Sequence, residues 1–407
     1  MIILSYDING DGIISNQLYD INGNEVIGPV YDINGNEIPL GSIDISKRHD
    51  VVYSQGNIYA LLIGTTLHRS MDGGNSFPVS IDVSQVGTIK NIHIFTDGTL
   101  NIFGHRTAFY SDDWVSLHPS TILDENGDQY TPDTYDTFSV TKHNPQIPVI
   151  GGKELYVFGN YCITNEYNQR KNIWYTIDKG HTYKVAYAFG LSGCRHVHGV
   201  FYNESDSSFW AYTGDSGTEC KVLKGIYNAT NDTWVWDLIA QGSDFKFSGL
   251  CVYDNMFYWC KDYTPGSVMK APYLTIADVT THETILDNLP NDCVTLVIDY
   301  DTGEMLVGLS IYRTGTSPSQ GSASDDCRRL YYSSDGITFD YVTGDVPDYY
   351  PYSDTMYYGV FPLNNDKKIL SGLWSRSHEN LDAWDKVPSI WLDDIVRSKW
   401  PNAFQKT

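Results

Sequence analysis

The sequence of 407 residues predicts an all-β fold, a β-propeller with seven blades or, as the alternative, six. Two observations predict it. The chain is rich in aromatic residues (14%) and has no long amphipathic helical pattern. In addition, a polar turn followed by an apolar run that closes on glycine recurs at intervals of roughly forty to sixty residues. The copies end at Gly64, Gly104, Gly159, Gly214, Gly308 and Gly372, and a seventh ends at Cys260.

The composition argues against several classes of protein. The net charge is −23, and the basic residues are scattered, whereas nucleic-acid binding requires clustered Lys and Arg. The opening MIILSYDINGDG has no basic segment before a long apolar one, so we expect no signal peptide. No stretch approaches the roughly 18 apolar residues of a membrane span. We therefore expect neither a nucleic-acid partner nor membrane insertion.

The seven cysteines are an odd number without CxxC spacing. This pattern argues against a disulfide framework and against a zinc site, and we expect no metal. Cys251 and Cys260 could face each other across a hairpin, but the spacing favours buried free thiols.

Residues 1–44 form a separate segment with a shorter repeat. Copies of YDINGD or YDINGN begin at Tyr6, Tyr19 and Tyr31, and each places Asn-Gly between short strands, which predicts a tight hairpin. Hairpins this small are marginal in water. The segment should therefore pack on its own copies, on sister subunits or on a larger particle, which predicts an attachment or oligomerisation role and a homo-oligomer.

The first copy also matches the opening of a calcium-binding EF-hand loop at Asp7, Asn9 and Asp11. The twelfth position of that loop is Leu18, where a bidentate Glu should complete the calcium coordination. We therefore expect no calcium here and no cofactor. The segment resembles short YDINGN-type segments at the start of tail-associated proteins of gut bacteriophages, which implies a chain located in a virion tail and extracellular after release.

A second signal recurs at residues 70–77 and 176–183, which both read S/T-x-D-x-G-x-S/T-aromatic, and in a shorter form at 333–339. The carboxylate can accept backbone N–H groups of its own turn, and glycine supplies positive φ. Degenerate copies lie at 111–114 and 231–234. The motif resembles the Asp-box (BNR repeat) of sialidase-like propellers, which implies a structural role on an outer hairpin for Ser70, Asp72, Gly74, Phe77, Thr176, Asp178, Gly180, Tyr183, Ser333, Asp335 and Phe339.

The boxes set the expected strand order. In the first unit the box follows the third strand, so the phrase that ends in glycine is the second strand. The seven blades then cover residues 45–86, 87–122, 135–190, 193–241, 243–291, 292–346 and 352–400, and together with the rest of 45–407 they form the propeller domain.

Loops that leave the second strand should share one face with loops that enter the first strand. The residues at these positions are rich in His, Arg, Asp, Tyr and Trp. His196 and His198, two apart on a strand, should point to one side. The predicted ligand-binding residues are His105, Arg106, Arg195, Arg313, Trp374, Arg376 and His378, and the catalytic candidates are His196, His198, Asp215, Asp262 and Tyr161.

This set of residues suits an acidic carbohydrate, because Arg pairs with carboxylates and aromatic rings stack on sugars. Residues 195–266 also resemble bacterial and phage BNR proteins described as sialidase-like. However, the sequence lacks the arginine motif near the start and an assured Tyr/Glu nucleophile pair. Polysaccharide lyases on seven-bladed propellers offer a further resemblance, which implies His196 or His198 as base and Tyr161 or Tyr202 as acid.

Three functions stay open at this point. The favoured one is a virion tail or fibre protein that recognises a host surface polysaccharide or receptor without cleaving it. The alternative is a glycan-cleaving enzyme, either a polysaccharide lyase or a glycosidase, that acts on acidic host polysaccharide. The third is a purely structural particle component.

Overall fold

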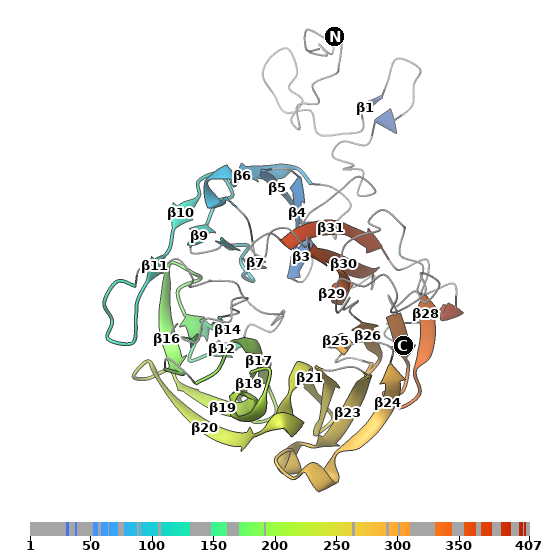
Figure 1. Ribbon diagram of the computed structural model, residues 1–407. Coiled ribbons are helices and arrows are strands. Elements are labelled where there is room, and N and C mark those ends of the chain that lie inside the picture. Colours follow the sequence, from blue (N-terminus) through green and yellow to red (C-terminus); the bar gives the residue numbers. More distant parts are fainter. Residues whose placement is uncertain are drawn as a thin grey trace, which may run out of the picture.

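The structure is a computed structural model (Figure 1). It describes residues 52–130, 148–160, 171–309, 330–343 and 399–403 with short gaps, the strands β1 (Val30–Tyr31) and β2 (Glu37–Ile38), and the backbone of three further strands between 354 and 391. β1 pairs with β2 in an antiparallel hairpin. Asp7, Asn9 and Asp11 lie outside the described residues, so the calcium interpretation stays a prediction.

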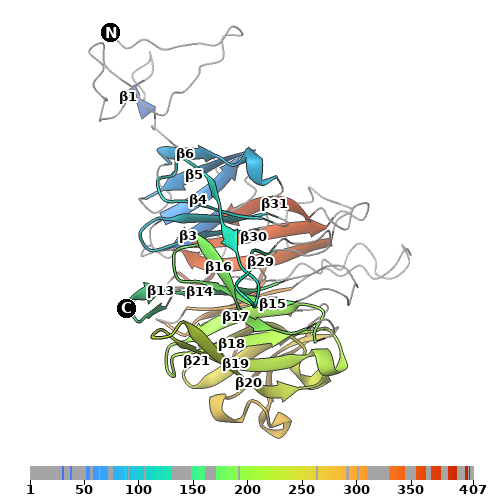
Figure 2. The same ribbon diagram turned by 90° about the vertical axis from the view of Figure 1, so that its left-hand side faces the viewer.

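The predicted all-β class is confirmed. Strands that are consecutive in the chain form small, mainly antiparallel sheets, which follow one another around a ring in chain order (Figure 1). The last sheet lies beside the first, as the view turned by 90° also shows (Figure 2). This arrangement is a β-propeller. The described strands form seven such sheets, and the number of blades in the complete ring stays a prediction.

The first three sheets are built as follows. The first contains β3 (Val52–Gln55), β4 (Ile58–Ile63), β5 (Thr66–Ser70) and β6 (Val79–Asp82). The second contains β7 (Asn91–Ile94), β8 (Leu100–Phe103), β9 (Ala108–Ser111) and β10 (His118–Pro119). The third contains β14 (Tyr156–Gly159), β15 (Asn172–Thr176), β16 (Thr182–Ala188) and β11 (Thr121–Ile122). A separate pair is β12 (Val149–Ile150) with β13 (Lys153–Glu154).

The remaining sheets continue the pattern. The fourth contains β17 (Val197–Asn203), β18 (Ser208–Thr213), β19 (Lys221–Asn228) and β20 (Thr233–Gln241). The fifth contains β21 (Phe247–Tyr253), β22 (Met256–Lys261), β23 (Gly266–Pro272) and β24 (Glu283–Leu289). The sixth contains β25 (Cys293–Ile298), β26 (Met305–Leu309), β27 (Leu330–Ser333) and β28 (Asp340–Thr343). The seventh contains β29 (Asp354–Leu363), β30 (Lys368–Arg376) and β31 (Trp384–Trp391).

Two expectations about strand order need correction. β11 was expected to close the second blade, but it pairs in parallel with β16 at the outer edge of the third sheet. β14, which carries the phrase ending at Gly159, is the end strand of its sheet among the described residues, but residues 131–147 lie outside them, so its place as a second strand stays a prediction. β30 was expected to end at Gly372, but it continues through Arg376 because its residues pair with β29 and β31 beyond the glycine.

The core lies between adjacent sheets. Every residue of β17 and β18 is buried, because each sheet packs on a neighbour at both faces and neither face meets water. Phe201 and Trp210 of the fourth sheet pack with Phe257 and Trp259 of the fifth in one such layer. Burial of a large apolar side chain contributes about 1.5–3 kcal/mol, so these layers are the main source of stability.

The turns at the predicted Asp-boxes share one hydrogen-bond pattern. Asp178 Oδ1 accepts the backbone N–H of Thr182 at 2.9 Å, and Thr176 Oγ1 accepts that of Gly180 at 2.9 Å. Asp335 Oδ1 accepts the N–H groups of Ile337 and Thr338 at 2.8 and 2.7 Å. These carboxylates therefore bind their own turns.

The degenerate copy at 111–114 forms the same turn. Asp113 Oδ1 accepts the N–H groups of Val115 and Ser116, and Trp114 has φ 60° where the turn at 333–339 has Gly336. The copy at 231–234 differs, because Asp232 accepts hydrogen bonds from Tyr175, Tyr227 and Lys184 instead. In the box at 70–77, residues 72–76, which include Asp72 and Gly74, lie outside the described residues.

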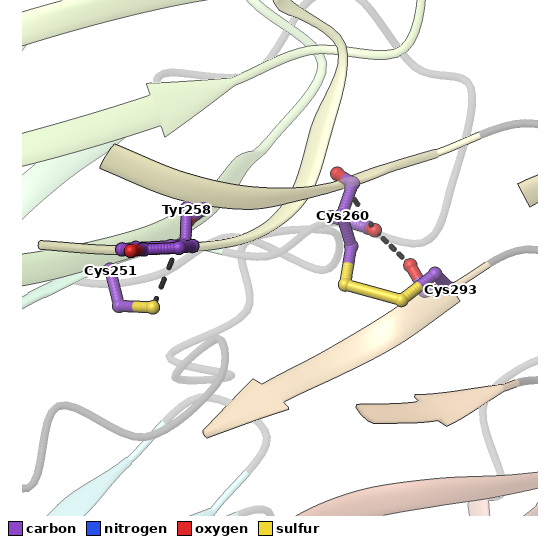
Figure 3. Close-up of a disulfide and its surroundings, with 5 residues drawn as sticks. Cys251, Tyr258, Cys260 and Cys293 are labelled. Atoms are coloured by element: carbon purple, nitrogen blue, oxygen red, sulfur yellow. Dashed lines mark hydrogen bonds between the residues drawn. A yellow bond between two sulfur atoms is a disulfide. The ribbon is translucent and has the colours of Figure 1, made fainter. Parts of the chain in front are cut away.

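A disulfide joins the fifth and sixth sheets between Cys260 of β22 and Cys293 of β25 (Figure 3). The expectation of a free thiol is therefore wrong for Cys260, as is the expectation of no disulfide, whereas for Cys251 it is confirmed. Cys251 does not face Cys260: its register partner is Tyr258, and a register shift between Phe247 and Gly249 puts Gly249 opposite Cys260. Cys251 is a buried free thiol.

None of the helical segments among the described residues has the length and apolar character required to span a membrane.

Candidate functional site

Four predicted residues meet at one end of the fourth sheet. Arg195 and His196 lie just before the innermost strand β17, His198 is the second residue of that strand, and Asp215 lies shortly after the end of β18. The two segments are adjacent because Val197 pairs with Thr213 and the N–H of Gly214 donates to the carbonyl of His196 at 3.0 Å. We call Arg195, His196, His198 and Asp215 the β17 cluster.

A register shift in the strand brings the two imidazoles together. The pairing of β17 with β18 shifts between Val197 and Gly199, so His198 lies at the irregularity. The two ring centroids are 4.6 Å apart and the ring planes differ by 31°. Both side chains therefore lie on one side of the strand, and their Nε2 atoms are 2.7 Å apart.

Asp215 binds both histidines and the arginine. Its Oδ1 lies 2.9 Å from His196 Nε2 and 3.2 Å from His198 Nε2, while its Oδ2 accepts a hydrogen bond from Arg195 Nη1 at 2.5 Å. Each carboxylate oxygen thus has its own set of partners, which fixes the orientation of the group.

The cluster is shielded but open to solvent at one side. His196 and His198 are 3% and 5% exposed, whereas the side chains of Arg195 and Asp215 are 29% and 23% exposed. Burial acts to raise the pKa of Asp215, but hydrogen bonds and charges from His196 and His198 outweigh it and hold the pKa well below the usual range of a carboxyl. Asp215 is therefore a carboxylate at any physiological pH.

The neighbouring sheet orients His198. Its Nδ1 hydrogen-bonds the carbonyl oxygen of Phe247, the first residue of β21. Because a carbonyl only accepts, Nδ1 carries the hydrogen and Nε2 points toward Asp215. The β17 cluster thus lies where the inner ends of the fourth and fifth sheets meet.

Asp262 belongs to a second ion pair nearby. It follows β22 and lies 3.4 Å from Lys246 Nζ. Burial raises the pKa of the Cys220 thiol to about 11; Lys246 opposes this shift, and the charges of Asp215 and Asp262 add to it. Both carboxylates therefore act on this one thiol, while each has a cationic partner of its own.

The other predicted site residues are placed differently. His105, Arg106, Tyr161, Arg313 and His378 lie outside the described residues. Trp374 and Arg376 lie within β30, of which only the backbone is described. Tyr202, considered as a proton donor, is 8% exposed and packs on Phe209 in the core.

Two features of the site were not predicted from the sequence. The Phe247 carbonyl, which orients His198, has no side-chain signal in the sequence. We expected no metal from the sequence, whereas in the structure His196, His198 and Asp215 offer three ligand atoms within 4.8 Å of one another. The H-x-H spacing at 196–198 was the available signal, and the third ligand lies seventeen residues further along the chain from His198.

Comparison with known proteins adds little to this geometry. No family model and no curated protein matches the chain. Among solved structures it is similar to a candidate 6-phosphogluconolactonase from Bacteroides fragilis NCTC 9343, with 13% identity over 84% of this chain and 94% of that one and a TM-score of 0.46. It is also similar to the WD40 domain of SCAP from fission yeast, with 10% identity over 85% of this chain and 88% of that one and a TM-score of 0.37.

A candidate exo-β-1,3-galactanase from Bifidobacterium bifidum s17 is a third similar structure, with 13% identity over 66% of this chain and 94% of that one and a TM-score of 0.38. Similarities this low carry no argument about activity. The propeller assignment rests on the sheet order and the ring described above.

Proposed function

We propose that this chain is a particle-associated β-propeller that recognises an acidic glycan of a host cell surface at the β17 cluster. The observation that carries the proposal is the convergence of Arg195, His196, His198 and Asp215 from two loops onto one partly open site. The chemistry of these groups matches that of an acidic sugar, which offers a carboxylate and several hydroxyl groups.

The exposed members of the cluster would contact the ligand. A guanidinium carries five donors in a planar fork, so Arg195 can hold Asp215 and also bind a sugar carboxylate. Asp215 can accept hydrogen bonds from sugar hydroxyls. The buried histidines hold Asp215 in place, and such preorganisation reduces the entropy that binding would otherwise cost.

Attachment to a particle is the second part of the proposal. It rests on the repeats in residues 1–44 and on the hairpin of β1 and β2, which is too small to be stable alone. We propose that this segment joins the chain to sister subunits or to other virion proteins and that the chain acts in a phage tail, outside the cell after release.

A binding panel tests the glycan proposal. Wild-type protein is applied to immobilised capsular and surface polysaccharides of candidate hosts, together with two variants that each remove the cation of an ion pair. Arg195→Met acts at the β17 cluster, and Lys184→Met removes the partner of Asp232, 2.6 Å away at the outer part of the third sheet. We expect Arg195→Met to weaken binding at least tenfold and Lys184→Met to leave it unchanged.

Failure of the wild-type protein to bind any host polysaccharide would refute the proposal. So would equal losses in the two variants, because binding would then not depend on the β17 cluster. Antibody labelling of intact particles tests the location separately, and a chain absent from every particle would contradict the attachment.

Glycan cleavage is the alternative, and one observation favours it. The Nε2 atoms of His196 and His198 lie within hydrogen-bond range of each other and of Asp215, an arrangement in which an imidazole can move a proton. A lyase acting on a uronate polysaccharide would release unsaturated products that absorb in the ultraviolet. Neither ultraviolet absorbance nor new reducing ends across a broad panel would leave recognition as the function.

The third possibility, a structural component of the particle, predicts that no glycan binds and that particles lacking the chain fail to assemble. The same panel and labelling separate it from recognition.

A further inference from the structure

We propose that His196, His198 and Asp215 bind one divalent transition-metal ion. The proposal concerns the same cluster but does not depend on the glycan function, and its test uses no glycan.

The spacing of the three ligand atoms fits a single ion. His196 Nε2, His198 Nε2 and Asp215 Oδ1 are 2.7, 2.9 and 3.2 Å from one another. With metal–ligand bonds of about 2.1 Å, neighbouring ligands in an octahedral site lie about 3.0 Å apart, and those in a tetrahedral site about 3.4 Å. The three atoms already span one triangular face of such a polyhedron.

The hydrogen bonds of the cluster direct the three atoms toward one point. His198 donates from Nδ1 to the Phe247 carbonyl, so Nε2 is its remaining ring nitrogen and faces Asp215 Oδ1. A metal-ligating histidine commonly has this second bond, which fixes its tautomer and its orientation. Asp215 Oδ1 only accepts, so the contacts among the three atoms need a proton or a metal ion between them.

The two histidines are buried and Asp215 carries a negative charge, and both properties favour a bound cation. The imidazoles are almost fully buried, so the electrostatic interaction among the three ligand atoms is little screened by water. Asp215 supplies one negative charge, and Arg195 binds its other oxygen, Oδ2, while Oδ1 is directed at the histidines. The arginine thereby acts as an outer partner that holds the carboxylate in a ligating orientation.

The donor set selects the class of metal. Two imidazole nitrogens and one carboxylate oxygen suit ions of the manganese-to-zinc series, whereas Ca²⁺ and Mg²⁺ prefer oxygen ligands alone. Three protein ligands leave at least one coordination position for water or a ligand, as in catalytic rather than structural zinc sites. The partial exposure of Asp215 allows exchange with solvent. An ion bound here would occupy both Nε2 atoms and so prevent their use as bases.

Direct metal titration tests the proposal. Untagged full-length protein is treated with a chelator, dialysed, and titrated with Zn²⁺, Mn²⁺ and Co²⁺, with Ca²⁺ and Mg²⁺ as comparison ions. We expect one equivalent of a transition metal to bind per chain at this site, and the visible spectrum of bound Co²⁺ to indicate nitrogen ligands. His198→Gln and Asp215→Asn should each weaken binding at least tenfold.

His93→Gln is the matched control, because His93 is a buried histidine of the second sheet that stacks on Tyr156. Its metal binding should equal that of the wild type. Should the cluster variants fail to fold, crystals of the wild-type protein grown with Mn²⁺ decide the question by anomalous scattering. A peak among the three ligand atoms supports the proposal. Absence of a peak, binding of Ca²⁺ or Mg²⁺ alone, or affinity unchanged in the cluster variants overturns it.

Discussion

The glycine at position 180 offers a quantitative test of how the second and third sheets are joined. Gly180 lies in the turn between β15 and β16 with φ +85°, and a Cβ added there would lie 1.9 Å from Asn101 Oδ1 on β8. Asn101 is fully buried; its Nδ2 donates to the Lys179 carbonyl at 2.8 Å and its Oδ1 accepts from the Tyr183 hydroxyl. Gly180→Ala must therefore displace Asn101 and break both bonds.

The expected magnitude follows from two contributions. A left-handed conformation costs alanine about 1–2 kcal/mol relative to glycine. Each buried polar group that loses its partner costs a further ~1–3 kcal/mol. With both bonds of Asn101 lost, we expect Gly180→Ala to lower the free energy of unfolding by about 3–8 kcal/mol.

Gly127→Ala isolates the backbone contribution. Gly127 has nearly the same φ, +83°, and no atom lies within 4 Å of its added Cβ, so we expect a loss of only about 1–2 kcal/mol. Urea unfolding followed by tryptophan fluorescence compares the two variants. The double variant Gly180→Ala with Asn101→Ala should lose less than the sum of the single losses, because the truncated side chain no longer obstructs the Cβ. Equal losses for Gly180→Ala and Gly127→Ala would refute the argument.

Three further predictions concern turns and cysteines. Asp335→Ala should cost about 1 kcal/mol at neutral pH. Backbone N–H groups of Thr338 and Ile337 hold the pKa of Asp335 below its usual value, so its stabilisation is present above the unfolded-state pKa of about 4 and is lost as the pH falls. The difference from wild type in urea unfolding should therefore shrink in acid, and a constant difference would contradict this. Burial raises the pKa of Cys194 to about 12 and that of Cys220 to about 11. Both thiols should therefore resist iodoacetamide in the folded protein at pH 8 and react on unfolding, and rapid labelling of the native protein would contradict this. The stability that the two neutral thiols contribute is present below the unfolded-state pKa of about 8.5 and is lost as the pH rises toward their folded-state pKa values. Peptide mapping without reductant should recover Cys260 linked to Cys293, and recovery of unlinked peptides alone would refute the pairing. Since the bridge closes 33 residues, Cys260→Ala should cost about 3–4 kcal/mol in oxidised protein. In reduced protein it should cost only the smaller amount that truncation of a buried thiol costs, and Cys251→Ala is a control whose effect does not depend on reductant.

The sequence was sufficient to predict the sheets because their signal is local. Apolar runs such as that of β18, bounded by turn residues and closed by Gly214, mark a strand and its end without reference to the rest of the chain. The same holds for the turns at Asp178 and Asp335, whose hydrogen bonds lie within a few residues. Expectations based on pairing between distant segments were less accurate. β11 joins the third sheet by parallel pairing with β16, and β30 extends past Gly372 because both neighbours continue to pair with it.

The site shows the same division. Arg195, His196, His198 and Asp215 were nominated because they follow or precede strand ends on one face, and the structure brings these four together. Their detailed geometry depends on a register shift in β17 and on the Phe247 carbonyl of the next sheet, neither of which has a sequence signature. Cys293 likewise reaches Cys260 only because two sheets are adjacent in the ring.

The central claim is that the ligand site of this propeller is the β17 cluster rather than the turns that carry Asp178 and Asp335. The most direct measurement is a crystal structure of the full-length protein with the polysaccharide fragment that binds most tightly in the panel. We predict sugar density in contact with Arg195 and Asp215, at the inner ends of the fourth and fifth sheets. Density confined to the turns at 176–183 or 333–339, with none at the β17 cluster, would contradict the claim.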